Sequence, residues 1–217
     1  MKVPKLFASA LFVSSILLGS SAFADTVTFI GATGPSVGGV IVAPYQIQDS
    51  AILGGATIDV ICDDYVDHVS SGDTWTGQLE TFSISGILSP GALFGSSNTT
   101  LYDEAVYLYS EFLNGSADAG GANYAIWGLF DPSLTSNPSY TGTDAAALLS
   151  AITPSELSSF DYSPYDVITP TSLGSTGEPP QEFIYKDAAP TPEPSSLLLL
   201  SSGLVGLGFM KRKVFQS

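Results

Sequence analysis

An uncharged apolar segment near the C-terminus, residues 195–210, constrains this chain more than any other feature. The prolines in front of it, in Pro192-Glu193-Pro194, lack amide donors and fix φ, so neither a helix nor a central strand continues through them. Its sixteen residues fall just short of the roughly 17 to 25 of a membrane-spanning helix, and long basic side chains that reach the interface make up the difference. The basic cluster Lys211-Arg212-Lys213 is then expected on the cytoplasmic side. We therefore predict a Pro-rich linker at 188–194 and a single transmembrane helix with a basic tail at 195–217.

The N-terminal residues have the three parts of a secretory signal peptide. Lys2 and Lys5 are positively charged, residues 6–18 are apolar, and Ala22-Phe23-Ala24 is a small-x-small cleavage site. We predict a signal peptide at residues 1–24, export through the Sec machinery and a mature N-terminus at Asp25. A retained N-terminal anchor is the alternative.

The C-terminal features, taken in order, resemble the PEP-CTERM sorting signal of bacterial surface proteins. The resemblance is carried by the apolar segment and by Pro192, Glu193, Pro194, Lys211, Arg212 and Lys213. It implies that exosortase, a membrane-embedded processing enzyme, is a partner, and that exopolysaccharide is associated with the system. The chain would be held in the inner membrane before processing and would then reach the cell surface or the extracellular matrix. An ordinary C-terminal membrane anchor is the alternative.

The charge of the exported part argues against two classes of partner. Residues 25–190 contain twenty Asp and Glu but a single basic residue, Lys186, which gives a formal net charge of −19. Such a surface cannot neutralise phosphates, so nucleic acid and anionic lipids are disfavoured as partners. It favours solubility and the retention of divalent cations. Because Cys62 is the only cysteine, no internal disulfide can form.

Residues 25–187 are predicted to form one exported, β-rich domain. Segments rich in Val, Ile, Thr and aromatic residues, separated by Gly and Pro turns, predict strands at 25–31, 40–48, 57–62, 75–88 and 182–186. The apolar spacing becomes helical at 102–113, and further helices are predicted at 121–130, at 145–150 and after Thr153. The predicted fold is therefore mainly β, a sandwich or a barrel, with a helical insertion around residues 100–160.

Two short stretches, Cys62-Asp63-Asp64-Tyr65 and Asn123-Tyr124-Ala125-Ile126-Trp127, are similar in order and spacing to motifs of the bacterial surface thioester domains. In that family a cysteine thiolate attacks a Gln carboxamide, expels ammonia and leaves a thioester that traps amines. The resemblance implies a site at Cys62, Asn123 and Trp127, but Asn stands where the family has Gln. The Asn side chain is shorter by about 1.5 Å, and attack requires reacting atoms about 3 to 3.5 Å apart. A thioester-like site without the cross-link is therefore expected, and a working thioester is the alternative.

Acidic residues after the third predicted strand offer the hard oxygen ligands that calcium prefers. The candidates are Asp63, Asp64 and Asp67, with Asp73 nearby in sequence. Their spacing does not fit an EF-hand loop, and solvated turn carboxylates are the alternative. No other cofactor is predicted: His68 is the only histidine, so zinc would lack its usual ligands. Cys62 and His68 also have no evident oxyanion hole beside them, which disfavours a thiol protease.

Together these features predict a non-enzymatic surface or matrix protein that associates with exopolysaccharide. A covalent adhesin acting through Cys62 is the alternative. A hydrolase acting on matrix sugars would need two carboxylates roughly 5 to 10 Å apart in a cleft, and a sequence with this many acidic residues does not exclude one.

Overall fold

The computed structural model describes residues 25–49, 54–86 and 91–187 of the chain. The predicted signal peptide at 1–24, the linker at 188–194 and the transmembrane helix at 195–217 lie outside the described residues. No helix within the described ranges is both long and apolar enough to cross a membrane.

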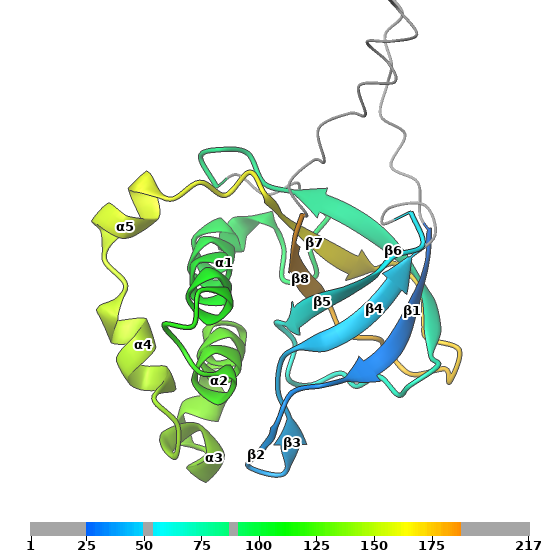
Figure 1. The fold of residues 1–217 in the computed structure, drawn as a ribbon, viewed down its shortest axis with the longest axis horizontal. Helices are drawn as coiled ribbons and strands as arrows, with labels where there is room; N and C mark the ends of the chain where they lie inside the picture. The colour runs from blue at the N-terminus through cyan, green and yellow to red at the C-terminus, as the bar shows by residue number, and fades with distance from the viewer. Residues whose placement is uncertain (1–24, 50–53, 87–90, 188–217) are drawn as a thin grey trace, which may run out of the picture.

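Six strands close into a barrel in the order β1-β4-β5-β8-β7-β6, and every neighbouring pair is antiparallel. Their bounds are β1 Asp25–Ala32, β4 Tyr45–Asp49, β5 Thr57–Cys62, β6 Thr74–Thr81, β7 Tyr165–Pro170 and β8 Phe183–Lys186. A small hairpin, β2 Ser36–Val37 and β3 Val40–Ile41, extends from the barrel between β1 and β4 (Figure 1). Closure pairs both edges of every barrel strand, so the barrel itself has no free edge within the described residues. Of the two predicted architectures, the barrel is the one the chain adopts.

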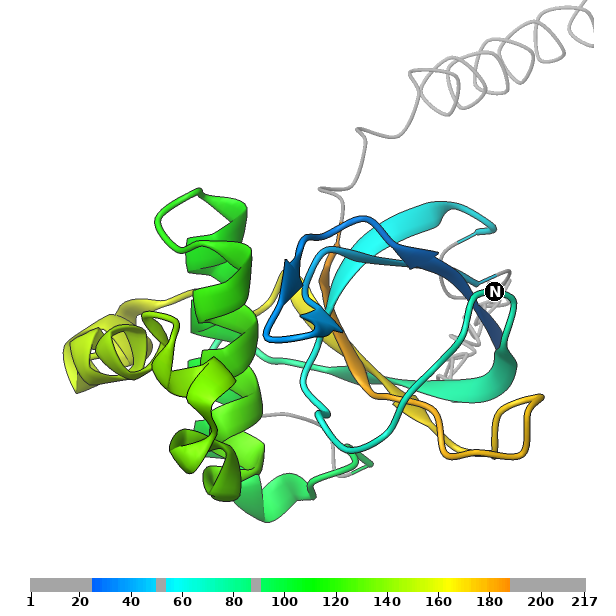
Figure 2. The same ribbon diagram turned by 90° about the horizontal axis from the view of Figure 1, so that it is seen from below.

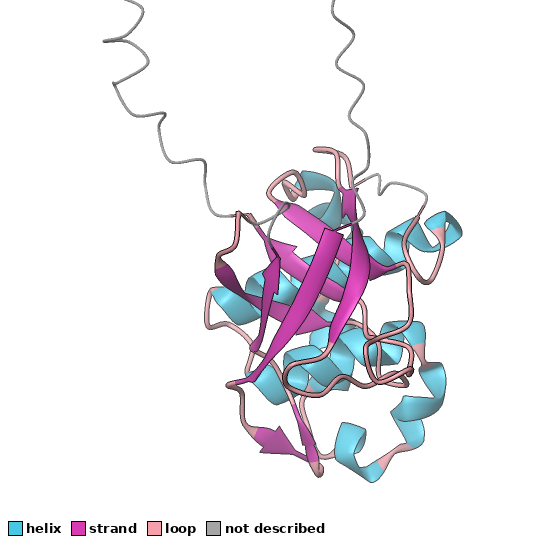
Figure 3. Cartoon of the chain, turned by 90° about the vertical axis from the view of Figure 1, so that its right-hand side faces the viewer, coloured by secondary structure: helices cyan, strands magenta, loops and turns pink. Residues whose placement is uncertain are grey.

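The helices form a layer on one side of the barrel, and in the chain they lie between β6 and β7 (Figure 2). Their bounds are η1 Ser96–Asn98, α1 Thr99–Leu113, α2 Ala119–Phe130, η2 Pro132–Ser136, α3 Pro138–Thr141, α4 Ala145–Ala151 and α5 Pro154–Ser159. α1 and α2 pack against each other beside the barrel, and α4 covers the outer side of α2 (Figure 1). Viewed from the barrel side, the strands cross in front of this layer (Figure 3). The predicted helical insertion is confirmed.

Local sequence signals explain where these helices begin and end. α1 stops at the predicted Asn114-Gly115, where Gly115 takes a φ of 77° that favours glycine. α5 begins with the predicted capping box, in which Thr153 accepts from the backbone of Glu156 and the Glu156 carboxylate accepts from the backbone of Thr153. Four residues of the apolar stripe predicted for this helix, Tyr102, Ala105, Val106 and Tyr109, are buried, whereas Phe112 is half-buried and Leu113 is 43% exposed.

The structure corrects two predicted strands. The segment 40–48 is divided, because Pro44 has no amide donor and the barrel ladder starts at Tyr45. The segment 75–88 ends as a strand at Thr81. Ser83 then accepts from the backbone N–H of Gly86, and its hydroxyl accepts from the N–H of Ser85, so local hydrogen bonds replace the ladder.

Strand β7 was missed from the sequence. Five of its six residues, Tyr165 to Thr169, are buried. Its sequence therefore lacks the alternation of apolar and polar residues that is typical of a strand with one face exposed to water. It is also short, follows Pro164 and ends at Pro170, and prolines at both ends of a short segment favour an irregular structure.

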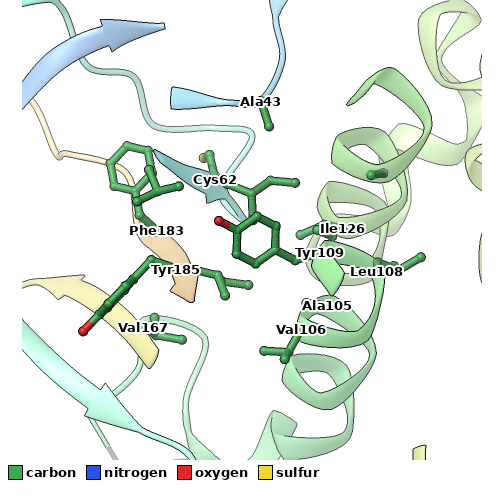
Figure 4. Close-up of a cluster of buried hydrophobic side chains, with 14 of the residues drawn as sticks. Ala43, Cys62, Ala105, Val106, Leu108, Tyr109, Ile126, Val167, Phe183 and Tyr185 are labelled. Carbon is green, nitrogen blue, oxygen red and sulfur yellow. The ribbon is translucent and has the colours of Figure 1, made fainter. Parts of the chain in front are cut away.

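An aromatic cluster fills the interior of the barrel. Phe183 is fully buried, and its ring centroid lies 6.1 Å from Phe29, 6.0 Å from Tyr45 and 6.1 Å from Trp75. A second part of the core lies between the barrel and the helices, where side chains from the strands meet those of α1 and α2 (Figure 4). One continuous core therefore joins the two layers.

Both ends of the described domain lie at the same end of the barrel. β1 is antiparallel to β4, β4 to β5, and β5 to β8, so β1 and β8 run in opposite directions. The start of β1 and the end of β8 therefore lie at the same end of the barrel. The opposite end is formed by the end of β1, the start of β4, the end of β5 and the start of β8, and it carries the β2–β3 hairpin (Figure 1).

Phe183→Ala should lower the free energy of unfolding by about 3 to 5 kcal/mol, because it removes a buried ring from three aromatic neighbours. Phe183→Leu should cost less, since it leaves a smaller cavity. Leu173→Ala, at a side chain that is 62% exposed, should change stability by less than about 0.5 kcal/mol. Urea denaturation measures all three. Equal losses for Phe183→Ala and Leu173→Ala would contradict the assigned core.

Candidate functional site

The structure brings Cys62 and Asn123 together at the end of the barrel that carries the hairpin. Asn123 is fully buried in α2. Its Nδ2 donates to the carbonyl of Cys62 at 2.9 Å, and its Oδ1 accepts from the backbone N–H of Ala43 at 2.8 Å. In the register that pairs Tyr45 with Val60, Ala43 would be the residue opposite Cys62. The Asn123 amide therefore occupies the position where β4 and β5 separate, and it satisfies both backbone groups.

The thiol of Cys62 is enclosed. Its sulfur donates to the carbonyl oxygen of Asp64 at 2.9 Å and accepts from the N–H of Asp64 at 3.3 Å. Burial raises the pKa of the thiol well above its usual value, and the neighbouring side chains of Asp63 and Asp64 raise it further. The Asp64 backbone and the Trp127 side chain act on this pKa in the opposite direction. A neutral thiol is a poor nucleophile, so this environment does not activate Cys62.

Trp127 completes the predicted trio and belongs to an aromatic group. Its ring centroid lies 5.1 Å from Tyr65 and 5.1 Å from Tyr124. The structure therefore gathers Cys62, Asn123 and Trp127 in one place, with both polar atoms of the Asn123 amide bonded to the backbone.

A buried carboxyl pair, Asp63 and Glu182, was not anticipated from the sequence. Both side chains are fully buried. Glu182 accepts from the Tyr102 hydroxyl at 2.5 Å, from the backbone N–H of Leu93 at 2.8 Å, and from the Thr169 hydroxyl. A Glu in a buried strand segment, directly before Phe183, was the one sequence signal of this pair.

The proton of the pair belongs to Asp63. No N–H or hydroxyl donor of another described residue reaches either carboxyl oxygen of Asp63, and this carboxyl group lies against that of Glu182. Two carboxylates form a hydrogen bond only when one is protonated. Burial and the neighbouring Glu182 raise the pKa of Asp63, whereas the hydroxyl and N–H donors favour the ionised form of Glu182 against its own burial. Asp63 is therefore the donor and Glu182 the acceptor.

The carboxylates of Asp64 and Asp73 accept hydrogen bonds from backbone N–H groups. Asp64 accepts from the N–H groups of Val66 and Asp67, and Asp73 accepts from the N–H of Ser70. Burial and the Asp64 carboxylate raise the pKa of Asp67. Within the described ranges no three His, Cys, Asp or Glu side chains form a group that could hold a metal ion. The predicted calcium ligands Asp63, Asp64 and Asp67 thus do not converge, and Asp63 faces Glu182 instead.

A cavity of about 380 Å³ opens at the same barrel end. It lies between the end of β1, the β2–β3 hairpin, the loop at residues 65–71 and α2, and its described lining includes Phe29, Ile41, Tyr45, Tyr65, Trp127 and Gln181. Cys62, Asp63 and Glu182 are not among the described residues that line it. The sequence did not reveal this cavity, because its walls come from five separate segments of the chain: residues 29–32, 40–45 and 65–71, Trp127 and Gln181. The exposed His68 lies on its rim.

Comparison with known proteins identifies one segment of the chain. Residues 190–213 match the family described as PEP-CTERM protein-sorting motif, which includes the predicted motif from Pro192 to Lys213. The motif makes the chain an exosortase-targeted, exported protein that undergoes processing at the membrane and reaches the surface or the extracellular space. No curated protein and no solved structure matches the chain.

The buried pair should make the fold less stable as pH rises. The unfolded chain releases both protons near pH 4, whereas the folded chain keeps one to a higher pH, so the slope of unfolding free energy against pH is negative. Asp63→Asn supplies a permanent N–H donor to Glu182. We expect this variant to be about 1 to 3 kcal/mol more stable than the native protein at pH 8 and to lose this advantage near pH 4.

Two other carboxyl groups determine the lower limit of the pH range for this measurement. Burial raises the pKa of Asp103 and of Asp166 to about 6, and both have largely titrated by pH 7. Urea denaturation between pH 7 and 8 keeps most of the Cys62 thiol protonated in both the folded and the unfolded chain, and the change in slope from the native chain to Asp63→Asn then reports on the pair. Asp118→Asn, which replaces an exposed helix cap with an equally good one, is the charge-matched control and should keep the native slope. A native slope in Asp63→Asn would show that Asp63 is ionised in the fold.

Proposed function

We propose that this protein is a non-enzymatic component of the cell surface or extracellular matrix that associates with exopolysaccharide after exosortase processing. The observation that carries the proposal is the sorting motif at residues 190–213, placed after a single acidic domain. The motif directs export and processing, and the acidic domain is the part of the protein that reaches the surface.

The position of the acidic groups supports a non-enzymatic role. A glycoside hydrolase must bring two carboxyl groups against the scissile bond, one of them as an acid. Asp63 and Glu182 have the required chemistry, but both are fully buried and Glu182 is saturated by donors from the protein. A sugar has no access to this pair, which makes its role structural.

The charge of the domain supports association with a hydrated polysaccharide. A formal charge of −19 over residues 25–190 concentrates divalent cations at the surface. Cations held in this way can bridge the protein to an acidic polysaccharide, with no need for a dedicated metal centre.

The sorting route can be separated from simple membrane anchoring with two variants. Pro192→Ala/Glu193→Ala/Pro194→Ala keeps the apolar segment and the basic tail, whereas deletion of residues 191–217 removes all three. We expect the native chain to reach the surface fraction without its tail, the triple variant to stay uncut in the inner membrane, and the deletion variant to be released directly. Cell fractionation with intact-mass spectrometry distinguishes these products. Native processing of the triple variant would show that the segment is only an anchor.

The same fractions test the polysaccharide association. In cells that make no exopolysaccharide, the processed protein should move from the matrix fraction to the medium, and a chelator should release it from a normal matrix. Retention under both conditions would contradict the association.

A covalent adhesin is the second candidate, favoured by the meeting of Cys62, Asn123 and Trp127. In that mechanism Sγ of Cys62 would bond the side-chain carbonyl carbon of Asn123, the C–N bond would break, and ammonia would leave with the thiol proton. The amide that would have to be cleaved is bonded at both ends to the backbone, and the thiol is neutral and hydrogen-bonded. Both observations favour an uncleaved Asn123 that joins the barrel to α2.

Intact mass and thiol labelling decide between the two candidates. We expect the purified protein to have the full mass of its sequence after processing, with one thiol that reacts only after unfolding, because Cys62 is fully buried. Cys62→Ala is the control and should not label at all. A mass lower by one ammonia, with no labelling of the unfolded native chain, would establish the thioester.

A further inference from the structure

The cavity at the hairpin end of the barrel has the size of a small-molecule site. Its volume of about 380 Å³ falls within the roughly 300 to 1,000 Å³ of ligand pockets. β1, the hairpin and the loop at 65–71 enclose it on separate sides, and α2 contributes Trp127. These elements are fixed by the barrel and by the Asn123 bridge, so the walls are preformed.

Aromatic rings form much of the wall. Tyr65 and Trp127 lie 5.1 Å apart at an interplanar angle of 59°, and Phe29 and Tyr45 lie 6.3 Å apart at 46°. Aromatic rings prefer offset-stacked or edge-to-face contacts with one another, so a cavity lined by four of them suits an inserted ring. Ile41, which is 50% exposed, adds an apolar rim from β3.

The charge of the lining restricts the ligand further. The domain carries a net charge of −19, yet no Asp or Glu occurs among the described residues that line the cavity. A cationic ligand would find no carboxylate inside, so only the aromatic faces would offset the loss of its hydration, and an anionic one would be repelled by the surrounding surface. An uncharged ligand meets neither penalty.

Three polar side-chain atoms of the lining are already used by the protein, whereas the indole N–H of Trp127 has no hydrogen-bond partner among the described residues. The Tyr45 hydroxyl donates to the carbonyl of Ile41 at 2.6 Å, and the Ser71 hydroxyl donates to that of Ile30 at 2.6 Å. Gln181 Nε2 donates to the carbonyl of Asp64 at 3.0 Å. A sugar would lose hydrogen bonds to water on entering and would regain few, which argues against a carbohydrate in this cavity.

We propose that the cavity is a binding site for a small, uncharged, apolar molecule that contains a ring. This site is separate from the surface carboxylates assigned above to the polysaccharide, and the inference does not depend on that association. The ring inserts between the aromatic walls, and the rim residue Ile41 covers one edge.

The experiment uses the mature chain in lipid nanodiscs, with 5-fluorotryptophan in place of both tryptophans. Fluorine resonances report only on the protein, so probe that partitions into lipid does not contribute. Trp127 lines the cavity, whereas Trp75 packs on Phe183 inside the barrel and serves as an internal check of the fold. The probes are naphthalene, its anionic analogue 2-naphthoate and methyl glucoside.

Naphthalene should shift the Trp127 resonance saturably and leave that of Trp75 in place. 2-Naphthoate should bind at least tenfold more weakly, and methyl glucoside should have no effect. Ile41→Glu should weaken naphthalene binding by about tenfold, or about 1.4 kcal/mol. Ile84→Glu, at another exposed isoleucine outside the described lining, should match the native chain.

Three results would overturn the proposal. The first is a Trp127 resonance that does not move up to the solubility limit of naphthalene. The second is equal binding of naphthalene and 2-naphthoate, or a shift with methyl glucoside. The third is equal naphthalene affinity in Ile41→Glu and Ile84→Glu when the Trp75 resonance shows that both are folded.

Discussion

The carboxamide of Asn123 is the interaction on which the arrangement of the two layers depends. Where β4 and β5 separate, Ala43 and Cys62 would each leave a backbone group without a partner in a buried place. One amide from α2 satisfies both, at 2.8 Å and 2.9 Å, and so joins the helical layer to the barrel. An unpaired buried polar group costs about 1 to 3 kcal/mol, so the amide removes two such costs and also fixes where α2 sits. The cavity wall contributed by Trp127, one helical turn further along α2, follows from this placement.

The scarcity of basic residues determines how the buried carboxyl groups are stabilised. With one Lys in the exported part, a buried carboxylate has no Arg or Lys to pair with, and burial without compensation is expensive. The chain solves this at Asp63 and Glu182 by keeping a proton between them and surrounding Glu182 with hydroxyl and N–H donors. Tyr102 from α1 and Thr169 from β7 therefore hold the helices and the barrel together through neutral and singly charged groups, without an ion pair.

Patterns confined to one segment were the ones that sequence could predict. The span of β5, the end of α1 at Asn114-Gly115 and the capping box of Thr153 depend on neighbours in the chain, and all three are present. The barrel itself was one of two predicted architectures. Strand β7 was not predicted, because burial on both faces removes the alternation, and Ser83 and Ser85 form a turn where their alternation with Phe82 and Ile84 favoured a strand. The Asp63–Glu182 pair and the cavity depend on contacts between distant segments, and no local pattern encodes them. The meeting of Cys62 with Asn123 was anticipated only through a family resemblance.

The barrel has a direction, because both ends of the described domain emerge at one pole and the cavity opens at the other. The described domain ends at Asp187, at the pole remote from the opening. The length of the barrel therefore separates the cavity mouth from the point where the chain leaves the domain, and a substitution at one pole leaves the local contacts of the other unchanged.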